Sequence, residues 1–372
     1  PLYVPYKILN VIRLARQAEV ALGKPVVPVF WMATEDHDLA EVDHATINGH
    51  TVRWVGRARG AVGRIELTGM AQVVDEAVAA LGPGAHAGWV AERLRAAYAD
   101  GRTLAQATRQ FVHDLFGRYG LVIIDGDDST LKRRFVPIME QEVLHQVGQR
   151  AVGYANERIA ERYRVQALAR EINLFRLRPG HRSRIVPDGD AFQVLDGGPL
   201  WSLDALLHQV HTAPQDFSPN VLLRPIYQET VLPNIAYIGG GGELAYWMQL
   251  RWLFQALQVP MPAVFLRTSA ATISAKHFGQ WSQMGLSSAD LFATPDSLKA
   301  VVAMREAPFR TELSTQRERM DRIFSDILQQ AMKADATLRG AVDARRTQAL
   351  RGVQRLEKAL VRAAKRDQEV LM

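Results

Sequence analysis

The chain has 372 residues, 48% of them hydrophobic and 23% charged, which is typical of a folded protein with a sizeable core, and it has no cysteine, which excludes disulfides, thiolate zinc sites and a cysteine nucleophile. It contains no run of about 18 apolar residues and no signal-peptide pattern, so no membrane segment is predicted and a cytoplasmic location is the default expectation. Most of the net charge of +6 lies in residues 301–372, where 15 Lys and Arg stand against 10 Asp and Glu.

The first predicted element is a helix. Apolar residues recur at helical spacing from Tyr6 to Leu22, and Gly23 and Pro25 then end the pattern. The chain opens at Pro1 without a methionine, and this helix begins with nothing before it to pack against. An amino-terminal truncation is therefore expected.

A short apolar stretch that ends in charge follows the helix. Residues 26–32 hold six apolar residues interrupted only by Pro28, which predicts a strand buried on both faces. Thr34 is a candidate N-cap, and seven ionisable residues follow it: Glu35, Asp36, His37, Asp38, Glu41, Asp43 and His44. Ligands of open α/β sheets bind at the carboxyl ends of strands, so this is the predicted catalytic region. An ordinary acidic helix start would explain the acids but not the two histidines.

A second strand of the same kind is predicted further along the chain. Short β-like pieces with many glycines fill residues 45–70, and helical periodicity follows at 71–81, 86–98 and 103–118. The apolar run 121–124 then ends in Asp125, Asp127 and Asp128. Two strands are thus expected to deliver carboxylates to one sheet edge.

The middle of the chain is predicted to be an insertion. Residues 130–172 are typical of one or two long helices, and residues 173–195 indicate short strands with turns at Pro179-Gly180 and Asp188-Gly189. The α/β core is predicted to span 1–285, with insertions at about 56–120 and 140–215.

Residues 217–267 form a second motif-rich region. A strand at 234–238, a four-glycine turn at 239–242, a helix at 243–257 and a strand at 262–266 are predicted. A glycine turn that leads into a helix exposes N–H groups toward an anion. The turn lacks the lysine of a P-loop and the spacing of a dinucleotide fingerprint, so an ordinary tight turn remains the alternative.

Polar residues lie among apolar neighbours in this region: Asn220, Arg224, Gln228, Tyr246, Gln249 and Arg267. Arg224 and Gln228 are four residues apart and would share a helix face. An arginine suits a bidentate grip on a substrate carboxylate, although pairing with a core acid is its other ordinary role.

The last part of the chain has heptad spacing. Apolar residues from Leu313 to Ala331 and from Ala349 to Ala363 are separated by threes, fours and one seven, which predicts an antiparallel helical hairpin or coiled coil from 309–332 and 339–370, with Gly340 near the break. Residues 286–372 are therefore predicted to form a helical domain that supports a homodimer. Its basic faces do not favour nucleic acid, because no aromatic residue is interleaved after Phe324.

Four motifs carry a family resemblance: PVFWMATEDHDLAEVDH at 28–44, GLVIIDGDD at 120–128, FSPNVLLRPIYQETVLPNIAYIGGGGELAYWMQL at 217–250 and MP-x-V-x-x-R at 261–267. In these the chain resembles the bacillithiol biosynthesis family of cysteine-adding enzymes. The resemblance implies a Rossmann-like parallel-sheet core with helical insertions, similar to nucleotidylyltransferases and class I aminoacyl-tRNA synthetases, and a carboxy-terminal α-helical coiled coil that supports a homodimer. It also implies a ligase that joins cysteine to glucosaminyl-malate through an amide bond. Family members carry a further strand and glycine-rich turn before the segment that matches Pro1 to Lys7.

Amide formation needs a base, an activated carboxyl and stabilisation of the developing oxyanion. His37 or Asp38 is a candidate base toward the cysteine ammonium, and Glu35 or Asp36 could hold that ammonium. The candidate substrate-binding residues, for the malyl carboxylate or a phosphate, are Asn220, Arg224, Gln228, Gly239, Gly240, Gly241, Gly242, Glu243, Tyr246 and Arg267. The cofactor is left open, since ATP or ADP would suit a ligase but no Walker lysine is present.

Two other classes of function remain as alternatives. One is a metal-dependent hydrolase in which Glu35, Asp36, His37 and Asp38, with Asp125 or Asp127, bind a divalent ion. The other is a scaffold protein whose helical tail binds a partner while the core is inert.

Overall fold

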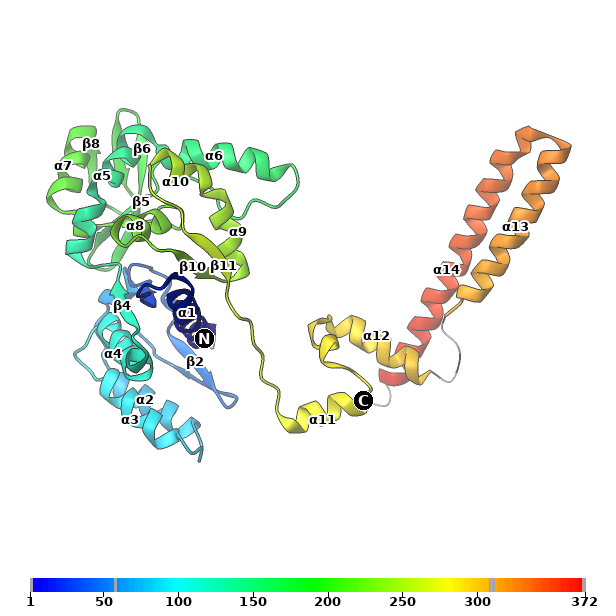
Figure 1. Cartoon of the computed structure of the whole chain (residues 1–372), viewed down its shortest axis with the longest axis horizontal. Helices are drawn as coiled ribbons and strands as arrows, with labels where there is room; N and C mark the ends of the chain where they lie inside the picture. The colour runs from blue at the N-terminus through cyan, green and yellow to red at the C-terminus, as the bar shows by residue number, and fades with distance from the viewer. Residues whose placement is uncertain (1–2, 57–58, 308, 310–311, 370–372) are drawn as a thin grey trace. The chain divides into compact units, whose positions relative to one another are not determined.

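The computed structural model describes residues 3–56, 59–307, 309 and 312–369, and predicted positions at 1–2, 57–58, 310–311 and 370 lie outside the described residues. The chain divides into two compact units, Pro1–Ala270 and Ala271–Met372 (Figure 1). Helix α11 (Ala275–Gln283) belongs to the second of these units, whereas the sequence predicts a boundary at 285/286. The Trp281 indole donates to the Ser287 carbonyl at 2.8 Å.

All four predicted core strands are present, and they pair in parallel. Strand β1 (Val29–Met32) pairs with β4 (Val122–Asp125), and β10 (Ala236–Gly239) pairs with β11 (Ala263–Leu266). The prediction of one continuous sheet was wrong, since within the described residues these are two separate two-stranded sheets. Each pair joins two strands that follow one another among the four predicted core strands. Met32 and Asp125, the last residues of β1 and β4, are paired, so the acidic loops that follow these strands lie at the same edge.

Helix α1 (Tyr3–Leu22) confirms the first prediction and packs beside β10 (Figure 1). Its Ile8 and Ile12 are buried against Val112, Phe116 and Leu121. Gly23 follows the helix with a φ of 61°, a left-handed conformation in which glycine carries no steric cost.

The first insertion forms a small helical layer. The antiparallel hairpin β2 (His44–Ile47) and β3 (His50–Arg53) precedes it, and α2 (Met70–Ala80), α3 (Ala87–Ala97) and α4 (Leu104–Phe116) lie within it. Trp54, Leu67 and Met70 are at the centre of its own hydrophobic cluster. The three helices predicted from periodicity are confirmed.

The second insertion carries the largest sheet. Helices α5 (Ser129–His145) and α6 (Val147–Ala160) precede an antiparallel sheet in the order β8-β7-β6-β5-β9. Its strands are β5 (Leu174–Arg178), β6 (His181–Asp188), β7 (Ala191–Val194), β8 (Leu200–Ser202) and β9 (Phe217–Pro219), with α7 (Leu203–Thr212) between β8 and β9. The predicted turns at Pro179-Gly180 and Asp188-Gly189 are confirmed.

Three helices complete the first unit: α8 (Leu223–Val231), α9 (Gly241–Gln249) and α10 (Arg251–Ala256). The helix predicted at 243–257 is divided at Leu250, whose N–H bonds to the carbonyl of Trp247 at 3.0 Å, three residues back. The principal core, with Phe135, Tyr227 and Trp247 buried at its centre, is shared by these helices, α5 and the antiparallel sheet. Single 3₁₀ turns lie at Leu39–Glu41, Val62–Arg64, Gly117–Tyr119, Pro214–Asp216, Ser288–Phe292 and Ala336–Leu338.

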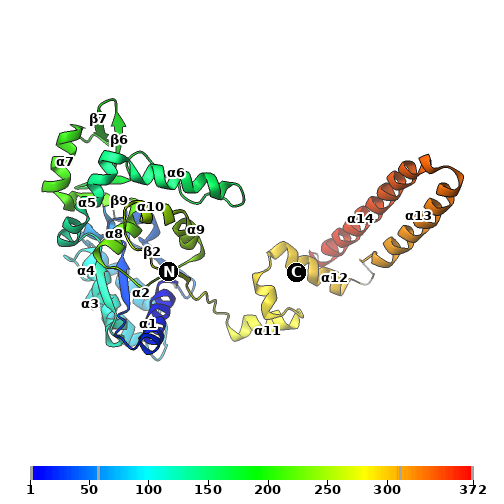
Figure 2. The same cartoon turned by 45° about the horizontal axis from the view of Figure 1, so that its top comes forward.

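The second unit is helical and contains the predicted hairpin. After α12 (Pro295–Glu306), helices α13 (Ser314–Ala334) and α14 (Arg339–Glu369) lie side by side (Figure 2). They are antiparallel, because Asp321 pairs with Arg346 while Leu313, nearer the start of α13, bonds to Glu357. Two predicted seam positions are wrong, since the side chains of Ile327 and Leu356 are 43% and 63% exposed. No helix in the described part of the chain is long and apolar enough to cross a membrane.

Candidate active site

The loops that follow β1 and β4 are tied together. The Thr34 hydroxyl donates to Asp125, and Asp125 Oδ1 also accepts the Asp127 N–H at 3.0 Å. Gly63 supports this loop by donating its N–H to the Thr34 carbonyl at 2.8 Å. A Cβ on Gly63 would lie 2.4 Å from the Thr34 Cβ, so only glycine allows this close approach.

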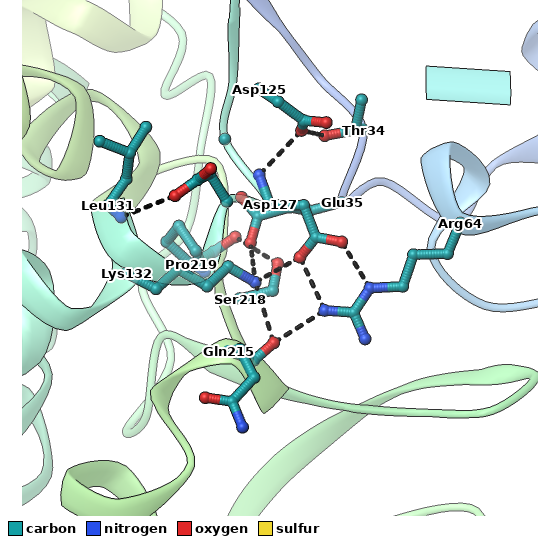
Figure 3. A network of polar contacts seen from close by, with 12 residues as sticks. Thr34, Glu35, Arg64, Asp125, Asp127, Leu131, Lys132, Gln215, Ser218 and Pro219 are labelled. Atoms are coloured by element: carbon teal, nitrogen blue, oxygen red, sulfur yellow. Dashed lines mark hydrogen bonds and ion pairs between the residues drawn. The ribbon is translucent and has the colours of Figure 1, made fainter. Parts of the chain in front are cut away.

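A buried charge network lies beneath these loops (Figure 3). The Lys132 ammonium lies 2.8 Å from Glu35 and 2.6 Å from Asp127, and its side chain is only 1% exposed. Arg64 contacts the same Asp127 through Nε and, at 2.8 Å, through NH2, and it also donates to the Gln215 carbonyl. Lys132 is thus a buried cation between two buried carboxylates, and Arg64, whose side chain is 42% exposed, supplies a second cation from the solvent side.

The two carboxylates of this network differ in acidity. Burial raises the pKa of Glu35 above its ordinary value, and Lys132 only partly offsets this. Burial would also raise the pKa of Asp127, but Arg64 and Lys132 outweigh it and hold that pKa below its ordinary value. The Glu35 carboxylate is thus buried and paired with Lys132, and this ion pair can hold the loop that follows β1 in place.

Asp36 and His37 are more exposed, and both contact Arg182 of β6. Arg182 NH1 lies 3.4 Å from Asp36 Oδ1 and 3.1 Å from His37 Nδ1. The other guanidinium nitrogens of Arg182 donate to the Ser218 hydroxyl at 3.2 Å and to the Pro219 carbonyl at 3.0 Å, and these bonds fix the position of the side chain. Asp38 is exposed and precedes a 3₁₀ turn without capping it through its side chain.

Glu243 organises the glycine turn. Its carboxylate accepts the Gly240 N–H at 2.8 Å, the Tyr237 hydroxyl at 2.5 Å and the Lys7 ammonium at 2.9 Å. The Gly240 amide of the predicted cradle is therefore already occupied, while Gly241 and Gly242 open the first turn of α9. Gly239 ends β10, and its carbonyl accepts the Arg267 N–H at 2.7 Å.

Three cations surround this turn. Arg224 donates to the Tyr246 hydroxyl at 2.9 Å, and Arg267 Nε lies 3.4 Å from the position that a Cβ would take on Gly240. Burial lowers the pKa of Lys7, although Glu243 raises it, and the charges of Arg224 and Arg267 lower it further. Three basic side chains thus stand around one carboxylate, an arrangement that can accept an anion.

Arg182 lies between the acidic loop and Arg224 of α8 in its electrostatic surroundings. Burial lowers the pKa of Arg182; the charges of Asp36 and Glu35 raise it, and the charge of Arg224 lowers it.

Other predicted residues have structural partners. Asn220 Oδ1 accepts the N–H groups of Leu222 and Leu223 at the start of α8, and its amide donates to Asn173 at 2.7 Å. Gln228 is buried and donates to Glu229 at 3.0 Å. Gln249 bonds to Ala167 and Asn156.

Sequence reasoning missed Lys7, Arg64, Lys132 and Arg182. Lys132 carried a weak signal, since it shares a helical stripe with the apolar Phe135 and Met139. The other three gave none, because their roles depend on contacts with residues far away in the sequence.

The metal-dependent hydrolase is not supported. Among the described residues no group of three or more His, Asp and Glu side chains is arranged to hold a metal ion. Asp125 and Asp127, the expected additional ligands, are instead engaged by Thr34, Arg64 and Lys132.

Comparison with known proteins agrees with these features. The family model "Bacillithiol biosynthesis BshC, N-terminal Rossmann-like domain" matches residues 1–268, and "Bacillithiol biosynthesis BshC, C-terminal coiled-coil domain" matches residues 270–372. A protein of Flavobacterium johnsoniae named "Putative cysteine ligase BshC" is 37% identical over 99% of this chain and 69% of its own length. Proteins of the same name from Cytophaga hutchinsonii and Geobacillus kaustophilus are 34% and 28% identical, over 98% and 99% of this chain and 69% and 71% of their own lengths.

Proposed function

Because the chain belongs to the bacillithiol biosynthesis BshC family, we propose that it is a cysteine ligase that joins cysteine to glucosaminyl-malate by forming an amide bond. The observation that carries the proposal is the cluster of Lys7, Arg224 and Arg267 around the glycine turn. A malyl group presents carboxylates, and guanidinium groups bind carboxylates with two parallel charge-assisted hydrogen bonds.

The two sides of the site suit two of the requirements of amide formation, a base and stabilisation of the developing oxyanion. The attacking amine must lose a proton, and His37 and Asp36 are exposed to solvent beside Arg182, where they can accept one. Arg224 and Arg267 can bind a carboxylate of the malyl group, and their positive charges can stabilise the negative charge that develops on the reacting carboxyl. Glu35, through its ion pair with Lys132, positions the loop that carries Asp36 and His37. A cytoplasmic location is part of the proposal, because that compartment keeps the cysteine substrate reduced.

Malate provides a first test of the proposal. Saturating malate should raise the melting temperature of the protein, since a ligand at about 100 times its dissociation constant stabilises the folded state by about 2.7 kcal/mol. Succinate, which lacks the hydroxyl, is the matched control and should give a smaller shift. No shift with malate under conditions where the protein melts cooperatively would contradict carboxylate recognition.

We also propose that the chain forms a homodimer through the α13–α14 hairpin. Ile323 and Ile327 lie four residues apart on α13 and are 53% and 43% exposed, so they share an apolar strip that the hairpin itself does not cover.

Replacing Ile323 and Ile327 together by aspartate should halve the molar mass measured by light scattering, because two charges would enter the apolar interface. Gln329→Asp, at an exposed polar position of the same helix but on a different face from Ile327, should leave the mass unchanged. A wild-type mass equal to that of one chain, or a dimer that survives the double substitution, would reject this interface.

A further inference from the structure

A basic pocket lies apart from the Arg224 cluster. Its cavity of about 640 Å³ opens between residues 59–66 and the turn that joins β5 to β6. The charged residues of its lining are Arg59, Arg64, Glu66, Arg176, Arg178 and Asp216. Four of these residues are arginines and two are acids.

The arginines of β5 have buried nitrogen atoms without hydrogen-bond partners. Arg176 donates through NH2 to Asp216 at 2.9 Å, but its NH1 is buried and has no partner among the described residues. Arg178 donates to the Ser183 hydroxyl and to the Leu195, Asp196 and Gly197 carbonyls, whereas its Nε is buried and also unpartnered there. The Arg176 guanidinium also packs over the rings of Trp201 and Phe217. Buried donors are normally satisfied, so these two nitrogens remain able to donate to an acceptor that is not part of the chain.

The charges around this pocket are not balanced: four arginines stand against Glu66, Asp216 and the neighbouring Asp127, an excess of one positive charge. Asp216 is paired with Arg176, and Arg64 is paired with Asp127 of the buried network. In the described part of the chain neither Arg59 nor Arg178 has a carboxylate within ion-pair distance. Arg176 and Arg178 are two apart on one strand, and both line the pocket.

We propose that this pocket binds a phosphate-bearing small molecule, held by Arg59, Arg176 and Arg178. The guanidinium groups reach the pocket from two segments, the 59–66 loop and β5. A tetrahedral phosphate offers several oxygens to donors arriving from different directions, whereas a carboxylate offers two in one plane. The cavity volume is within the range of small-molecule sites, about 300–1,000 Å³.

Arg64 connects the pocket to the candidate active site. It lines the pocket, and it also contacts Asp127, which pairs with Lys132 and through it with Glu35. A phosphate group bound in the pocket is therefore separated from the acidic loop by this chain of ion pairs.

Calorimetric titration of the full chain with pyrophosphate tests the proposal. Wild type should bind with saturation, and Arg59→Gln and Arg178→Gln should each weaken binding by about tenfold or more, the usual effect of losing one charge-assisted hydrogen bond. Arg134→Gln, at an exposed position of α5 outside the pocket, is the matched control and should bind as wild type does. Arg224→Ala should also retain pyrophosphate binding, which separates this site from the proposed malyl site.

Arg59 keeps the test decisive if the Arg178 variant fails to fold, because Arg59 is exposed and has no structural hydrogen bond to lose within the described residues. Absence of pyrophosphate binding, or binding that Arg59→Gln leaves unchanged, would overturn the proposal. Citrate that binds the Arg224→Ala protein as tightly as pyrophosphate does would overturn the phosphate assignment, because that variant lacks the proposed carboxylate site.

Discussion

Replacing Arg224 by alanine is expected to weaken binding of malate-type acids by roughly 30-fold to several thousand-fold, since truncating one partner of a desolvated charge pair costs about 2–5 kcal/mol. Arg224 has no carboxylate within ion-pair distance in the described part of the chain, and its hydrogen-bond partner is the Tyr246 hydroxyl. The alternative role of pairing with a core acid is therefore not observed. Its guanidinium retains donors for a ligand.

Lysine at position 224 should impair binding almost as much as alanine. An ammonium is a point charge on a flexible stem, so it loses the planar match to a carboxylate. Malate titrations on wild type, Arg224→Lys and Arg224→Ala, each with a melting curve to correct for folded protein, distinguish binding from stability. Full affinity in the lysine variant would exclude the bidentate role.

Replacing Lys132 by methionine is expected to lower the free energy of unfolding by about 3–5 kcal/mol, because it leaves two buried carboxylates short of a cation. Glu35 would lose the ion pair that the structure gives it, whereas Asp127 would keep Arg64. Urea unfolding of Lys132→Met against Lys24→Met, an exposed lysine of the same unit, measures the difference. Equal stability of the two variants would show that the network contributes little.

The loss of unfolding free energy in Lys132→Met should increase as the pH rises toward neutrality. Without Lys132 the pKa of Glu35, already raised by burial, should rise further. A carboxyl whose folded pKa exceeds its unfolded pKa binds more protons when folded, so its stabilisation is lost as the pH rises from the unfolded value through the folded one. The destabilisation by Lys132→Met should therefore be largest near neutral pH and shrink as the pH falls below about 4, where Glu35 becomes protonated in both states. Combining it with Glu35→Gln should recover part of the stability at neutral pH.

Local patterns in the sequence were sufficient to predict most elements. The run at 26–32 and the run at 121–124 both end in acids, and the structure places them side by side in parallel. The glycine turn was predicted as an open cradle, but Glu243 occupies its Gly240 amide, because a residue three positions into a helix can reach back to the N-cap.

Long-range charge pairing could not be predicted. Lys132 and Arg182 contact Glu35 and Asp36 from distant parts of the chain, and no spacing rule connects them. The seam of the hairpin was also only partly predictable, because heptad spacing does not specify which apolar residues face the partner helix: Phe324 is half-buried while Leu356 is exposed.

Formation of the amide product tests the central claim most directly. Purified protein would be incubated with cysteine and glucosaminyl-malate, with and without ATP, and the mixture analysed by mass spectrometry. The account predicts a species with the mass of both substrates less one water, formed by wild type and by Arg134→Gln and lost in Arg224→Ala. No product from folded wild-type protein under either condition, or undiminished product from Arg224→Ala, would contradict it.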